Sequence, residues 1–125
     1  MASPMVLDAC VLLNLIASDR ASEIFLAQQR RLLVGERAAK ESFYLRSADD
    51  PIERLPVELS ALVDASILEI VSIDGENETD MFIEFAASLD DGEAESLAVA
   101  HVRGYSIATD DRKARRVFSA YHSGE

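Results

Sequence analysis

The chain has 125 residues, and 23 Asp plus Glu against 12 Lys plus Arg give a formal net charge of −11. A length of this size suits one domain, its 49% of hydrophobic residues excludes wholesale disorder, and its one cysteine excludes a disulfide framework or a four-cysteine zinc site. Because the start lacks a signal-peptide pattern and no apolar run reaches the roughly 18 residues of a membrane span, we expect a cytoplasmic globular protein without a membrane partner.

Short apolar strands alternate with helical patterns along the chain. In chain order we expect a strand at 5–7, a helix capped by Asp8, a helix at 19–29, a strand at 32–34, a helix at 36–45, a helix at 56–65 with Pro56 as its first residue, a strand at 67–73, helices at 78–87 and 91–103, a strand at 105–108 and a helix at 110–121. Strands joined by helical crossovers predict an α/β fold with a mostly parallel sheet covered on both faces.

Acidic residues follow two of these strands directly. Asp8 comes straight after the first strand, and Asp110 and Asp111 follow the last strand across Thr109. In open parallel sheets, ligands bind outside the carboxyl ends of the strands, where the winding direction reverses. We expect these acids at that edge, although each of them also suits a simple helix cap.

Glu41 is an acid in an otherwise apolar row. At helical spacing the row reads Val34, Ala38, Glu41 and Leu45. A buried carboxylate is costly unless it is paired or binds a metal, so Glu41 is a candidate ligand that points into the core or a cleft. The alternative is that Glu41 lies at the margin of the row and reaches solvent.

A further group of acids opens the helix expected at 91–103. Asp90 and Glu93 have the spacing of a capping box, and acids favour a helix N-terminus. The helix is apolar nearly all round, so we expect it to be buried and to bring carboxylates to the edge of the core. Spacing alone does not choose between Asp91, Glu93 and Glu95.

Several carboxylates converging on one cleft would repel one another, and without a cation some would stay protonated. Hard oxygen ligands of this kind suit Mg²⁺ or Mn²⁺, which keep several waters and bind substrate phosphates. Such ions activate water and stabilise the attacking and leaving oxygens of a phosphodiester. The acids therefore predict metal-assisted phosphodiester hydrolysis.

Four motifs in order resemble PIN domains, most closely the VapC-like toxin ribonucleases of prokaryotic toxin–antitoxin systems: VLDACVLLNL at 6–15, AKES at 39–42, GEAESLAVA at 92–100 and TDDR at 109–112. The resemblance implies a single PIN-like domain over 1–125 with a three-layer α/β/α sandwich. It also implies a metal-dependent endoribonuclease that uses Mg²⁺ or Mn²⁺ on an RNA substrate. Many such toxins are homodimers held by a cognate antitoxin protein, which we expect as partners here.

The resemblance places the catalytic, metal-binding acids at four motif positions: Asp8, Glu41, Glu93 and Asp111. Many relatives carry Asp at the third position, where this chain has Glu93. Asp110 is adjacent to the fourth position and shares its role as a metal ligand. Thr109 supports the turn that presents these acids.

The chain departs from the family pattern at two points. Relatives often have Thr or Ser just after the first acid, whereas this chain has Ala9 and Cys10. We expect Cys10 to be a small buried residue. The family usually ends in a further edge strand after the last helix, whereas this sequence stops at Glu125, so we expect that strand either to be missing or to lie beyond it.

Three basic residues offset the negative charge near the expected metal site. Arg112, Arg115 and Arg116 share one face of the last helix, at spacings of three and four residues. We expect this ridge to bind RNA phosphates. The alternative is a solvated face paired with the acids between residues 74 and 95.

Two other functions compete with the ribonuclease. A catalytically inactive PIN-like module that acts by protein–protein binding would fit the net charge and the Glu at the third acid position, because a basic partner complements the charge. A phosphatase or phosphoacceptor with Asp8 as nucleophile is disfavoured. Dehalogenase-type sites need a second acid two residues later, where this chain has Cys10.

Overall fold

A computed structural model describes residues 3–18, 20–40 and 54–123 of the chain. Its strands form one four-stranded sheet in the order β3-β2-β1-β4, and every neighbouring pair is parallel. The strands are β1 (Met5–Leu7), β2 (Leu32–Gly35), β3 (Leu68–Val71) and β4 (Ser106–Ala108). The expected parallel sheet is confirmed.

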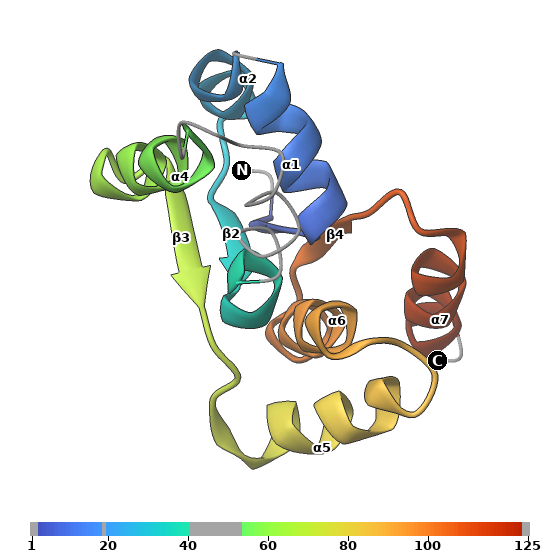
Figure 1. The fold of residues 1–125 in the computed structure, drawn as a ribbon. Helices are drawn as coiled ribbons and strands as arrows, with labels where there is room; N and C mark the ends of the chain where they lie inside the picture. Colours follow the sequence, from blue (N-terminus) through green and yellow to red (C-terminus); the bar gives the residue numbers. More distant parts are fainter. Residues whose placement is uncertain (1–2, 19, 41–53, 124–125) are drawn as a thin grey trace.

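Helices cover both faces of this sheet (Figure 1). One layer holds α1 (Ala9–Ala17), α2 (Ala21–Ala27), the helical residues 36–40 and α4 (Arg54–Asp64). The other layer holds α5 (Gly75–Ala86), α6 (Asp91–Arg103) and α7 (Arg112–Ser123). The arrangement is the expected three-layer α/β/α sandwich. None of the described helices is long and apolar enough to cross a membrane.

The two-residue period of the strands divides the core into two clusters. Val6 and Leu33 pack against α5, α6 and α7, whereas Leu7, Leu32 and Val34 pack against α1, α2 and α4. All five are at most 2% exposed. Successive side chains of a strand point to opposite faces, so a continuous apolar run supplies both layers at once.

Two helices begin earlier than the sequence pattern predicts. The prediction that Pro56 opens its helix is wrong, because α4 already begins at Arg54. Proline is tolerated there because the N–H groups of a first helical turn have no partner within the helix. The next helix begins at Gly75, not at Glu78, whose Oε1 accepts a hydrogen bond from the backbone N of Asp74 at 2.9 Å.

The prediction that Cys10 is buried is also wrong. Helix α1 buries Leu12 and Ile16, which are four residues apart and share one face. Cys10 lies about 200° around the helix from Leu12, and it is exposed. Its place beside the buried Asp8 therefore does not bring it into the core.

The winding of the sheet reverses at β1. The chain proceeds from β1 to β2 and β3 on one side and then returns to place β4 on the other side of β1. Leu7 lies opposite Ala108 in the parallel register, so the carboxyl ends of β1 and β4 are adjacent. Within the described residues no strand follows α7, and β4 forms one edge of the sheet.

Helix α6 is the central element of its layer, with buried residues in an unbroken run from Ala94 to Ala100. We predict that Leu97→Ala, at a side chain 1% exposed, lowers the free energy of unfolding by about 2–5 kcal/mol through lost apolar contact and a residual cavity. Urea denaturation measures this loss. The control Ile83→Ala, at a side chain 63% exposed on α5, should stay within about 0.5 kcal/mol of wild type.

Candidate active site

Asp8 is fixed between β1 and α1 by hydrogen bonds from three sides. Its backbone N donates to the carbonyl oxygen of Ala108 at 3.0 Å, which continues the pairing of β1 with β4. Its Oδ1 accepts from the backbone N of Val11 at 2.8 Å and so caps α1. Its Oδ2 accepts from the hydroxyl of Thr109. The carboxylate is 6% exposed and has one fixed orientation at the carboxyl edge of the sheet.

Thr109 joins the acids of the two strand ends. Its buried hydroxyl donates to Asp8 and accepts from the backbone N of Asp111 at 3.1 Å. The Oδ1 of Asp111 in turn accepts from the backbone N atoms of Lys113 at 2.8 Å and Ala114 at 3.1 Å, at the start of α7. Asp110, by contrast, is exposed. The side-chain bond to Thr109 therefore connects Asp8 with the turn that carries Asp111.

Glu93 brings a third carboxyl group to this edge from the first turn of α6. Its backbone N donates to Oδ1 of Asp90 at 2.9 Å, which confirms the predicted cap. Burial, the charge of Asp90, a hydrogen bond with Asp111 and the charges of Asp111 and Asp8 together raise the pKa of Glu93 to about 7. The side chain thus faces both strand-end acids.

The pKa of Asp111 is shifted in the opposite direction, below its usual value. The backbone N–H of Ala114, the hydrogen bond with Glu93 and the nearby Lys113 hold the pKa of Asp111 below its usual value. The hydrogen bond between the two carboxyl groups thus raises the pKa of Glu93 and lowers that of Asp111. Opposite shifts of this kind mark a pair of acids that compete for one proton.

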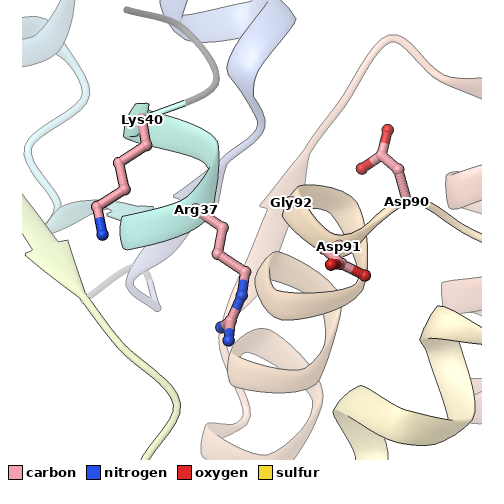
Figure 2. A pocket seen from close by; sticks show the side chains of 5 residues that line it. All are labelled: Arg37, Lys40, Asp90, Asp91 and Gly92. Carbon is pink, nitrogen blue, oxygen red and sulfur yellow. The ribbon is translucent and has the colours of Figure 1, made fainter. Parts of the chain in front are cut away.

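The structure separates the three acids that spacing left open on α6. Asp91 is exposed and lines a cavity of about 580 Å³ together with Arg37, Lys40, Asp90 and Gly92 (Figure 2). Glu95 is fully buried and binds Arg37. Of the three, Glu93 is the one whose side chain lies beside Asp8 and Asp111.

Glu41 lies outside the described residues. Residues 36–40, which precede it, are helical, and Val34 and Ala38 of its expected row are 0% and 1% exposed. Ala38 is the helical member of this row that the structure describes, whereas Val34 belongs to β2 and Leu45 lies outside the described residues. The orientation of Glu41 toward the core or a cleft stays a prediction.

The donor chemistry of Asp8, Glu93 and Asp111 fits a hard divalent cation. All three offer carboxylate oxygens, and the raised pKa of Glu93 shows that their negative charges are not fully compensated. Across the described ranges, no three His, Cys, Asp or Glu side chains gather closely enough to form a complete metal site. The acids meet instead in pairs, Asp8 through Thr109 and Glu93 with Asp111.

The expected basic ridge lies on α7, next to this edge. Arg112, Arg115 and Arg116 are exposed and, with Ser119, line a cavity of about 730 Å³. Within the part of the chain that the structure describes, no ion pair joins these three side chains to a carboxylate. The alternative of pairing with the acids of 74–95 is not observed there, and the guanidinium groups are open to solvent.

Sequence reasoning missed a contact beside the site, between Glu95 and Arg37. The available signal was a second acid inside the apolar helix that also carries Glu93. A charge in such a position needs a partner. The partner stands 58 residues earlier in the chain, so no local spacing identifies it.

Comparison with models of protein families matches residues 4–122 to a family described as a PIN domain. Comparison with curated proteins found no match. The matched range includes all four strands and the acids at the carboxyl edge, among them Asp8, Glu93 and Asp111.

The raised pKa of Glu93 predicts how pH affects the stability of the metal-free protein. The folded state raises this pKa from 4.5 to about 7, so its contribution to stability is complete below about pH 4.5 and is lost as pH rises to about 7. Glu93→Gln should remove that loss, which melting curves between pH 4 and 8 in EDTA measure as a flatter profile. The control Glu76→Gln, at an exposed position of α5, should keep the wild-type profile.

Proposed function

Because the chain belongs to the PIN domain family, we propose that it is a metal-dependent endoribonuclease that hydrolyses RNA phosphodiester bonds. PIN domains are in general nucleases that use divalent metal ions. The observation that carries the proposal is the two acid pairs at the point where the winding of the sheet reverses, Asp8 linked through Thr109 to Asp111 and Glu93 hydrogen-bonded to Asp111. Their charges repel, and a divalent cation relieves that repulsion.

In the proposed mechanism Asp8, Glu41, Glu93 and Asp111 hold Mg²⁺ or Mn²⁺, with Asp110 alongside. A bound ion would supply a water of lowered pKa and stabilise the charge on the phosphate. Asp8 and Asp111 present their carboxylates in fixed orientations because each also caps a helix.

The arginine ridge supplies the proposed contact with the substrate. Arg112, Arg115 and Arg116 bind backbone phosphates of the RNA on the side of the site formed by α7. Guanidinium groups pair with phosphate oxygens through two parallel hydrogen bonds. Local positive charge of this kind offsets the overall charge of −11, which otherwise repels RNA.

The finer proposal is a VapC-like toxin of a toxin–antitoxin pair. Residues 1–125 form one domain that acts in the cytoplasm as a homodimer and is held by an antitoxin. The resemblance of the four motifs supports this assignment. The acidic surface also complements a basic partner segment.

A catalytically inactive PIN-like module is the second candidate. The hydrogen bond between Glu93 and Asp111 favours it, because two acids that are bonded to each other need no ion between them. The net charge of −11 also suits binding to a basic protein better than binding to RNA. Metal-dependent cleavage of RNA distinguishes the two candidates, because the ribonuclease performs it and the inactive module does not.

Purified protein should cleave a mixed-sequence single-stranded RNA with Mn²⁺ and not with EDTA, and Asp8→Asn should abolish cleavage. Mn²⁺ should also raise the melting temperature of the wild type, because a ligand that binds the folded state stabilises it. Gel analysis of the RNA and melting curves measure the two effects. Loss of cleavage in the folded Asp8→Asn variant ties the activity to this site, whereas no cleavage and no melting shift would support the inactive module.

Arg115→Ala combined with Arg116→Ala should weaken RNA binding and reduce its dependence on salt. Each phosphate contact on a single strand contributes about 0.7 to the slope of log affinity against log salt, so the slope should fall by about 1.4. Fluorescence anisotropy with labelled RNA across a salt series measures it. The control Arg20→Ala, at a side chain 71% exposed near the start of α2, should keep both affinity and slope, and an unchanged double variant would contradict the ridge.

A further inference from the structure

A cavity of about 520 Å³ lies between the helical residues 36–40 and α5. Its volume is in the range of pockets that bind small organic ligands. The connection from β3 to α5 and one side chain of α6 complete its wall. Asp8, Glu93 and Asp111 are not among the residues that line it, so this cavity is separate from the proposed catalytic acids.

The side of the cavity formed by α5 is flat and largely apolar. Thr79, Phe82 and Ile83 lie on one face of this helix, at spacings of three and four residues, and Ile83 is 63% exposed. The guanidinium carbon of Arg37, which also lines the cavity, lies 4.7 Å from the ring centre of Phe82. Nucleobases stack on aromatic rings and on guanidinium planes. The cavity therefore has the surfaces that a flat heterocycle needs.

The charged groups of this cavity compensate one another in pairs. Oε2 of Glu95 accepts from Arg37 at 2.7 Å, and Nζ of Lys40 lies 2.9 Å from Oε1 of Glu36. The two cations and two carboxylates leave no net charge among the lining residues. A free anion or cation finds no uncompensated counter-charge there, so a neutral ligand with hydrogen-bonding groups fits better.

The cavity also offers hydrogen-bond acceptors. The hydroxyl of Ser72 donates to Oε2 of Glu36 at 2.6 Å, and the hydroxyl of Thr79 donates to the carbonyl oxygen of Gly75 at 2.9 Å. Both hydroxyl oxygens therefore keep lone pairs. Ser72 and Lys40 hold the pKa of Glu36 below its usual value, so its carboxylate is ionised near neutral pH. Such a carboxylate accepts from the exocyclic amino group of a base, as it does from N4 of cytosine.

A second cavity lies between this one and the carboxyl edge of the sheet. The cavity of about 580 Å³ at the start of α6 shares Arg37 and Lys40 with it. Figure 2 shows Arg37 reaching from its short helix toward α6, where Gly92 lines the same cavity. Gly92 directly precedes Glu93 in the sequence. The two cavities thus form neighbouring hollows beside the proposed catalytic acids.

We propose that the cavity between residues 36–40 and α5 binds one unstacked nucleobase that carries an exocyclic amino group. Phe82 and Arg37 contact the face of the base, and Glu36 accepts from its amino group. The inference deepens the proposed ribonuclease function, on which it rests only in that the base belongs to the RNA substrate. Sequence-specific proteins bind single-stranded RNA through splayed-out bases that they stack and hydrogen-bond.

Nucleosides test the base site without metal, phosphate or cleavage. In EDTA, millimolar cytidine should shift the amide resonances of residues 36–40, 72–73 and 79–83 and should bind at least fivefold tighter than uridine, which has an oxygen in place of the amino group. Phe82→Leu removes the ring, keeps an apolar side chain and should weaken cytidine binding about tenfold. The control Tyr105→Leu, at a partly buried aromatic residue outside the cavity, should keep wild-type affinity.

A second variant tests the choice of base. Glu36→Gln replaces the carboxylate by an amide, which also donates to the exocyclic oxygen of uridine, so cytidine and uridine should bind within twofold of each other. Glu69→Gln is the matched control. Glu69 is 44% exposed and pairs with Arg31, as Glu36 is 45% exposed and pairs with Lys40, but it does not line the cavity. Its replacement should leave the preference for cytidine unchanged.

Absence of shifts at these residues with both nucleosides, or a preference for cytidine that survives Glu36→Gln, would overturn the proposal. A peptide of alternating Lys and Leu that shifts the same resonances when neither nucleoside does would assign the cavity to a basic protein partner instead. Cleavage of RNA by a protein that binds no nucleoside removes the base site alone. Cytidine binding at this cavity in a protein that cleaves no RNA supports the base site and removes the ribonuclease proposal.

Discussion

The parallel pairing of β1 with β4 is the contact on which the site depends. Because Leu7 lies opposite Ala108, the next residues of both strands, Asp8 and Thr109, leave the sheet side by side. The backbone bond from Asp8 to Ala108 and the side-chain bond from Thr109 to Asp8 extend that pairing beyond the strands. A shift of one residue in this register would separate the two acidic turns and turn their side chains to the opposite face.

Capping and metal binding are compatible uses of the same carboxylates. An ionised carboxylate has about four acceptor positions. Asp8 uses one to accept a hydrogen bond at the N-terminus of α1 and one to accept from the hydroxyl of Thr109. The Oδ1 of Asp111 accepts hydrogen bonds from backbone N atoms at the N-terminus of α7. The caps fix where the remaining lone pairs point. A helix cap at a strand end therefore does not exclude the proposed role of the same acid as a metal ligand.

The sequence predicted those features that depend on local pattern. The strands, the buried helix α6 and the cap at Asp90 follow from periodicity and short spacings, and the structure shows each of them. Helix starts and contacts between distant segments were not predicted. Glu78 reaches back to the backbone of Asp74, so the helix begins before the residue that marks its pattern. The bond from Arg37 to Glu95 spans 58 residues, so no local spacing in the sequence indicates it.

Glu93 and Glu95, both near the start of α6, have identical side chains but different surroundings. Glu95 has a cation, Arg37, and a backbone N–H, so its buried charge is stable in the protein as it stands. Glu93 faces Asp8, Asp90 and Asp111, and within the described part of the chain no Lys or Arg forms an ion pair with it. Burial and these neighbouring acids raise the pKa of Glu93, whereas the charge of Glu95 is compensated within the fold. Because Glu93 has acids and no cation beside it among the described residues, it is the glutamate that the proposed metal ion would bind.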